Sequence, residues 1–103
     1  MTAHFVAVYE TPTDPEAFDR HYRDVHIPLG RKLPGLRRYT VSQTATAVRG
    51  VPYYLIADLE WDTIGDLRAA FASPEGRATA DDAAHLQDLA PVRSMIFTKE
   101  NVR

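Results

Sequence analysis

The sequence predicts an α+β fold whose elements follow the order β-α-β-β-α-β, and three observations support this. Four short segments are rich in apolar and β-branched residues, and two helical regions between them contain a capping residue followed by proline. Hydrophobic residues make up 45% and charged residues 25% of the 103 residues, as in ordinary globular proteins. No linker interrupts the order, so we expect residues 1–103 to form one ferredoxin-like domain with a four-stranded antiparallel sheet.

The first half of the chain predicts one strand and one long helix. The strand is expected over residues 4–9, and the helix begins at Pro15 with Asp14 as its cap. Because Pro28 disfavours helical geometry in the residue before it, we expect the helix to end near Ile27. One apolar stripe runs along this helix, formed by Phe18, Tyr22, Val25 and Leu29.

The second half predicts three strands and a second helical region. Strands are expected over residues 36–46 and 53–61, and strict alternation makes the latter the clearest strand of the chain. The helical region is expected to begin after a cap at Asp62 and to end near residue 89. The last strand is expected over residues 92–98.

The expected sheet is apolar on both faces. Tyr54 and Ile56 lie on the second face of the third strand, and Met95 and Phe97 lie on the second face of the last strand. Two helices cover only one face of a four-stranded sheet, so the other face needs a second cover. The simplest cover is another copy of the chain, and we therefore expect a homodimer built sheet against sheet.

Composition excludes several classes of protein. The net charge is −2 without a long block of one sign, so we expect no nucleic-acid or membrane partner. No apolar run approaches the roughly 18 residues of a membrane span, and the N-terminal residues do not look like a signal peptide. The absence of cysteine excludes disulfides and thiolate metal sites, and we expect a cytoplasmic protein.

One stretch of the chain carries a recognisable motif. Between Tyr9 and Tyr39 the sequence reads F-x-x-x-Y-x-x-x-H-x-P-L, followed by a P-G-L turn. This pattern resembles the EthD family, whose members belong to the dimeric α+β barrel superfamily, and weaker matches follow near residues 73–76 and 81–86. The motif residues in this chain are Phe18, Tyr22, His26, Pro28, Leu29, Pro34, Gly35 and Leu36.

The resemblance implies a homodimeric barrel and a range of possible chemistry. EthD proteins are associated with ether-degradation gene clusters and with the tailoring of aromatic polyketides. Relatives in the superfamily include cofactor-free monooxygenases, polyketide cyclases, isomerases and haem-binding enzymes. A shared fold does not choose among these activities, so the reaction depends on the residues of the site.

His26 and Tyr22 are the candidate catalytic residues. His26 lies at the edge of the apolar stripe, in the last expected turn of the helix, where the helix dipole favours a protonated imidazole. We expect it to face a cavity, to titrate around pH 6–7 and to exchange protons with a ligand. The alternatives are that His26 caps the helix end and that Tyr22 is an ordinary core aromatic residue.

The ligand pocket is expected between the helices and the sheet. Its substrate-binding residues would be aromatic, namely Tyr9, Phe18 and Trp61, with Trp61 in the helix-covered core. Among the charged residues of the third strand, Asp58 and Glu60 are expected to pair with Arg37 or Arg93.

The other histidines do not predict a metal site. His21 and His26 are five residues apart, so on an α-helix they point in different directions. His85 is expected to be solvated, and His4 to lie at the frayed start of a strand. We therefore expect no bound metal and no cofactor.

Together these residues favour a small cofactor-free enzyme acting on an apolar or aromatic small molecule. His26 would be the general acid/base, and Tyr22 would donate a hydrogen bond to a substrate carbonyl or phenolate. Cyclisation, dehydration and isomerisation need only these groups, and oxygenation is also open because an electron-rich substrate supplies its own electrons. The alternatives are a non-catalytic binding or accessory protein of a partner oxygenase, and a haem-binding protein.

Overall fold

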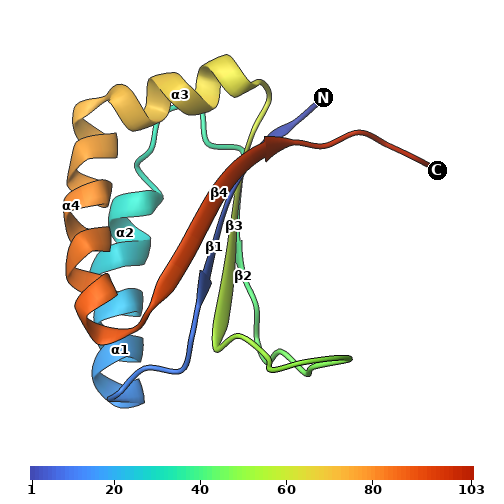
Figure 1. Ribbon diagram of the computed structural model, residues 1–103. Coiled ribbons are helices and arrows are strands. Elements are labelled where there is room, and N and C mark those ends of the chain that lie inside the picture. Colours follow the sequence, from blue (N-terminus) through green and yellow to red (C-terminus); the bar gives the residue numbers. More distant parts are fainter.

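A computed structural model describes residues 1–103, and Figure 1 shows a layer of helices covering one face of a sheet. The fold is ferredoxin-like, with the predicted order of elements. The strands are β1 (Ala3–Tyr9), β2 (Arg38–Val41), β3 (Leu55–Trp61) and β4 (Val92–Thr98). The helical elements are α1 (Pro15–His21), the π-helical segment η1 (Tyr22–His26), α2 (Ile27–Gly30), α3 (Ile64–Ala72) and α4 (Pro74–Leu89). None of these helices is long and apolar enough to cross a membrane.

The sheet is antiparallel throughout, with the strand order β2-β3-β1-β4. The first and last strands agree with the sequence to within one residue, but β2 and β3 are shorter than predicted. Ladder pairing of β2 stops at Val41, after which residues 43–52 form a loop that projects from the side of the sheet away from the helices (Figure 1).

The helix that begins at Pro15 does not end near Ile27, as the sequence predicts, but continues through Pro28 to Gly30. Between α1 and α2 the backbone widens into η1, where the Ile27 N–H donates to the carbonyl of Tyr22, five residues earlier. Pro28 lacks an N–H, and its ring clashes with the carbonyl four residues earlier in a regular α-helix. A wider turn just before the proline allows the helix to continue.

Side-chain caps define where the helices begin. The Asp14 carboxylate accepts a hydrogen bond from the Ala17 N–H, as predicted. The cap of α3 is Thr63 rather than the predicted Asp62, with Oγ1 3.0 Å from the Asp66 nitrogen. Gly76 allows α4 to begin directly against the end of α3, because a Cβ atom there would collide with backbone oxygens of α3.

The core lies between the helices and the sheet. Trp61 is fully buried there, as predicted, and its indole N–H donates to the Pro34 carbonyl at 2.8 Å. The alternate residues of β3 face the helices and are buried: Leu55, Ala57, Leu59 and Trp61. This face therefore positions any site formed between the two layers.

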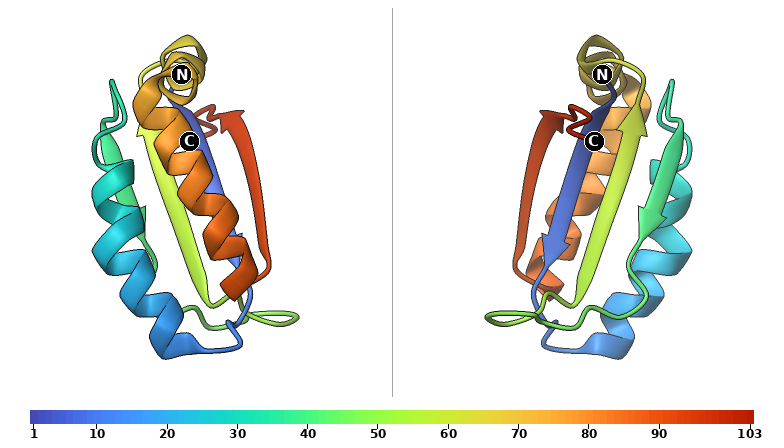
Figure 2. Two further views of the ribbon diagram at one scale, coloured as in Figure 1. Left: turned by 90° about the vertical axis from the view of Figure 1, so that its left-hand side faces the viewer. Right: turned by 90° about the vertical axis from the view of Figure 1, so that its right-hand side faces the viewer.

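The opposite face of the sheet has no covering layer (Figure 2). Met95 and Phe97 of β4 are 47% and 38% exposed, and Ile56 of β3 is partly exposed on the far side of β1. Tyr54, predicted for this face, instead packs its ring against Phe18, and its hydroxyl donates to the Asp19 carboxylate of α1. The open face is thus apolar in β1 and β4, whereas β3 contributes Ile56 together with the charged Asp58 and Glu60.

Candidate active site

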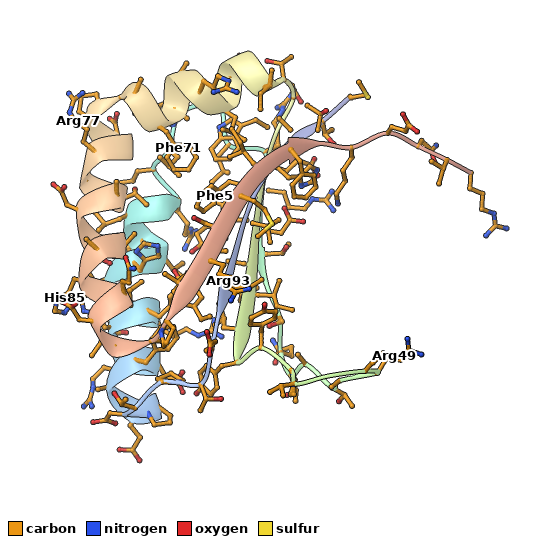
Figure 3. All side chains as sticks on the ribbon, in the orientation of Figure 1. Phe5, Arg49, Phe71, Arg77, His85 and Arg93 are labelled. Carbon is orange, nitrogen blue, oxygen red and sulfur yellow. The ribbon has the colours of Figure 1, made fainter.

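A cavity of about 350 Å³ lies between the helices and the sheet. Phe5 and Phe71 both line it, and the centroids of their rings are 5.0 Å apart (Figure 3). Such a volume is at the lower end of the range of small-molecule sites. Its polar lining comes from the helices and three strands and comprises Tyr9, Tyr22, His26, Tyr39, Thr79, Gln87 and Ser94.

His26 presents one ring nitrogen to this cavity and uses the other to bind a carboxylate. Its Nδ1 lies 2.8 Å from Oδ2 of Asp82 on α4. Since an ionised carboxylate only accepts hydrogen bonds, Nδ1 carries the proton and Nε2 carries a lone pair. Nε2 has no hydrogen-bond partner in the chain, and it remains accessible in the cavity wall, because no fully buried side-chain nitrogen or oxygen lacks a partner. This is the arrangement of a base oriented by a carboxylate.

His21 binds the same carboxylate, with its Nε2 2.7 Å from Oδ1 of Asp82. The prediction that His21 and His26 diverge is therefore wrong. In a regular α-helix, residues five apart are separated by about 140° around the axis. The π-helical segment η1 hydrogen-bonds residues five apart, so it turns both histidines toward α4.

Burial makes His26 a neutral group near pH 7. Desolvation lowers its pKa below the ordinary value of 6.5, and this exceeds the opposing effect of Asp82. For Asp82, burial alone would raise the pKa, but the hydrogen bonds from His21 and His26 hold it below its ordinary value. The pKa of His26 thus lies on the low side of its ordinary value. No helix end lies beside His26, contrary to the sequence prediction, since α2 continues to Gly30.

Two tyrosine hydroxyls meet at the wall of the cavity. The Tyr22 and Tyr39 oxygens are 2.7 Å apart, so one hydroxyl donates to the other and the second is left with a free proton. Burial raises the pKa of Tyr9, Tyr22 and Tyr39, so all three stay protonated. Gly30 makes room for Tyr39, because an alanine Cβ there would lie 2.7 Å from the Tyr39 ring.

The predicted site residues divide into two groups. Tyr9, Tyr22 and His26 line the cavity together. Phe18 and Trp61, predicted to bind substrate, do not line it and are completely buried in the core instead. Phe18 instead stacks on Tyr22 with a centroid distance of 5.7 Å, which supports the wall from behind.

Asp82 and Tyr39 are site residues that the sequence analysis missed. Asp82 lies on α4 between the buried Thr79 and Leu86, at the i+3 and i+7 spacing of a buried stripe. A carboxylate on the buried stripe of a helix needs a partner, and this is the sequence signal that indicates Asp82. Tyr39 alternates with exposed neighbours on the short β2, but its partner Tyr22 could not be identified from spacing.

A second Asp–His pair lies on the open face of the sheet. His4 is only 2% exposed, not frayed as expected, and its Nδ1 lies 2.7 Å from Asp58. Its Nε2 lies 3.0 Å from the Thr2 hydroxyl and 3.6 Å from Glu60, so neither nitrogen is free. The expected pairing of Asp58 and Glu60 with arginines is therefore wrong. Arg37 pairs with Asp62 instead, at 3.0 Å.

The chain has no group of three or more histidine or acidic side chains that could hold a metal ion. His85 is exposed on the outer side of α4, as expected, where Figure 3 shows it pointing away from the sheet. The fold and the site thus define a class: a ferredoxin-like protein with one small, aromatic-lined cavity and a carboxylate-bound histidine in its wall.

Comparison with known proteins places the chain within that class. Residues 10–90 match the EthD domain, and the chain belongs to the EthD family. It is 35% identical to an uncharacterized 11.0 kDa protein of Rhodococcus erythropolis, over 90% of this chain and 89% of the relative. It is 33% identical to an EthD family protein of Bacillus halodurans, whose crystal structure superposes with a TM-score of 0.86, over 97% of this chain and 100% of the other.

A more distant structure shares the fold. SnoaB, a cofactor-independent oxygenase of Streptomyces nogalater, is 20% identical to this chain and superposes with a TM-score of 0.72. The match covers 98% of this chain and 95% of SnoaB. At this level of identity the similarity bears on the fold.

Proposed function

We propose that this protein is a small enzyme that transfers protons to and from an apolar or aromatic small molecule held in the helix–sheet cavity. The observation that carries the proposal is the free Nε2 of His26 in the cavity wall, with Nδ1 fixed by Asp82. A histidine buried only for structural reasons has both nitrogens satisfied, as His4 does on the other face. An unpaired ring nitrogen in an aromatic-lined cavity can take up a proton from a bound ligand.

His26 and the tyrosine pair have complementary roles in this proposal. The lone pair on Nε2 takes a proton from the ligand, and Asp82 stabilises the imidazolium that forms. The negative charge left on the ligand resides on an oxygen, which accepts a hydrogen bond from the free hydroxyl of the Tyr22–Tyr39 pair. The substrate class that fits is a flat aromatic ketone or phenol with an acidic C–H or O–H group.

These groups support several reactions of one type. Cyclisation, dehydration and isomerisation each begin with removal of such a proton. Cofactor-free oxygenation begins in the same way, because the resulting anion supplies electrons to dioxygen. SnoaB is a cofactor-independent oxygenase with the same fold, which makes oxygenation a reaction to include in the proposal.

Anthrone provides a direct test of the proton transfer. It is a flat aromatic ketone whose methylene protons are acidic, and their exchange for deuterium in oxygen-free D₂O is followed by ¹H NMR. The protein should accelerate this exchange over buffer, and His26→Gln should abolish the acceleration. With oxygen admitted, formation of anthraquinone reports oxygenation separately.

The matched control is His85→Gln, which removes an exposed histidine from the outer side of α4 and should leave the exchange rate unchanged. Binding of anthrone without accelerated exchange, equal in the native protein and His26→Gln, would contradict the enzyme proposal. That result would favour the ligand-binding or accessory role instead.

We also propose that the open face of the sheet packs against a second copy of the chain. Val6, Val8 and Ile56 form its partly buried centre, and Met95 and Phe97 are the exposed apolar residues beside them. An apolar sheet face without a cover is an interaction surface. The loop of residues 43–52 and the C-terminal residues project beyond this face (Figure 1), where they would flank a second sheet.

A further inference from the structure

The sharing of Asp82 by two histidines gives His21 a role that the cavity lining does not reveal. The side chain of His21 is 22% exposed, whereas those of His26 and Asp82 are 9% and 11% exposed. His21 does not line the cavity, so it does not contact a ligand there. Among these three side chains, His21 is the most exposed to solvent.

We propose that His21 is a positioning residue that sets the basicity of His26 through their shared carboxylate, Asp82. This inference rests on the proposed proton transfer at His26. The geometry supports it. The hydrogen bond from His21 to Oδ1 fixes the rotation of the Asp82 carboxylate, and this rotation points Oδ2 at Nδ1 of His26. A carboxylate at the edge of the helical layer would otherwise be free to turn toward water.

The charge on His21 determines how strongly Asp82 attracts a proton to His26. When His21 carries a proton, its positive charge offsets the carboxylate, and a second positive charge on His26 becomes less favourable. The two histidines therefore compete for one negative charge. In this way His21 keeps His26 in its basic form to lower pH than Asp82 alone would allow, and it does so from outside the cavity.

Few other charged side chains lie near His21 and His26. From α4, His21 faces Asp82 and His85, and the His85 ring lies 4.6 Å from the His21 ring. His21 and His85 line a shallow depression on the outer surface, and Arg20 and Asp24, close to His21 in the sequence, line it too. On the cavity side His26 faces Tyr9, Tyr22 and Tyr39, whose raised pKa values keep them neutral.

Two substitutions of His21 test the inference in opposite directions. His21→Gln keeps a side-chain N–H for Asp82 but cannot take up a proton, and His21→Lys places a lasting positive charge there. Imidazole ¹⁵N NMR titration of the ligand-free protein measures the pKa of His26 in each variant. We expect the pKa of His26 to rise in His21→Gln and to fall in His21→Lys.

The control is His85→Gln. The His85 ring packs against His21 but makes no hydrogen bond to Asp82, so this change should leave the titration of His26 in place. An unchanged or lowered His26 pKa in His21→Gln, or equal shifts in His85→Gln, would overturn the inference. The acid limb of anthrone exchange should move with the His26 pKa. If the pKa moves but no variant or native protein exchanges anthrone, the positioning role stands and the proposed function fails.

Discussion

An Asp–His pair lies on each side of the sheet, one in the helical layer and one on the open face, and the pairs differ in what the second ring nitrogen contacts. On the helix-covered face, Asp82 binds Nδ1 of His26, and Nε2 faces a cavity. On the open face, Asp58 binds Nδ1 of His4, and Nε2 is occupied by the Thr2 hydroxyl at 3.0 Å. The distances to the carboxylates, 2.8 and 2.7 Å, are nearly the same.

This comparison shows that an Asp–His pair alone does not define a site of chemistry. Both histidines are almost completely buried, so burial does not distinguish them either. What distinguishes them is a free nitrogen beside a space large enough for a ligand. The predictions below test this distinction and the assignment of the two faces.

The largest effect is expected on proton exchange. His26→Gln should lower the anthrone exchange rate by roughly 10²–10⁴-fold, the usual contribution of a general base. His4→Gln should leave that rate within a few-fold of the native value, because His4 lies on the other face of the sheet. Exchange rates are measured by ¹H NMR. A similar loss of rate in His26→Gln and His4→Gln would contradict the distinction between the two Asp–His pairs.

A large loss of stability is expected for Trp61→Ala. Its indole is fully buried on the helix-covered face, so the change should cost about 3–5 kcal/mol in the free energy of unfolding. Val48→Ala, at the exposed tip of the loop, should cost almost nothing. Urea unfolding measures both, and a loss below about 1 kcal/mol for Trp61→Ala would contradict the assigned core.

The open face is tested by oligomeric state. Sedimentation at micromolar concentration should give twice the chain mass of 11.6 kDa. Met95→Glu, which places a charge on the open face, should shift the protein to monomer. Val25→Glu is the matched control, since Val25 is 39% exposed on the helical layer, and it should remain dimeric. A soluble native monomer would contradict the sheet-to-sheet dimer.

The smallest effect concerns stability at acidic pH. The unfolded chain takes up a proton on His26 near the ordinary pKa of 6.5, whereas the folded chain does so only at lower pH. The contribution of His26 is therefore complete above about pH 6.5 and is lost as the pH falls through its folded-state pKa. Asp82, whose pKa is also lowered, acts in the same direction at still lower pH.

Urea unfolding should show a lower free energy of unfolding at about pH 5 than at about pH 7.5 from this source. His26→Phe should make the dependence on pH less steep over the same interval. A protein that gains stability on acidification across this range would contradict the burial of a neutral His26.

The sequence predicts the fold well because its signals are local. Proline after a capping residue marks two helix starts, and strict alternation marks β3, so the order of elements follows directly. The EthD motif also identifies Tyr22 and His26, and both line the cavity.

The site is predicted only in part because its key contacts join distant elements. A regular helix separates His21 from His26, and only the π-helical segment before Pro28 turns both toward Asp82. The aromatic residues were assigned to the cavity by character alone. Spacing does not tell a residue that lines a cavity, such as Tyr9, from one that packs behind it, such as Phe18.

The most direct test of the account is the protonation state of His26 and its response to a ligand. Imidazole ¹⁵N NMR at pH about 7, with and without 1-naphthol as a flat aromatic probe, resolves both nitrogens of each histidine. We predict a neutral His26 with its proton on Nδ1, and a ligand shift confined to Nε2 of His26. A charged His26, a proton on Nε2, or a response at His4 or His85 instead would contradict the account.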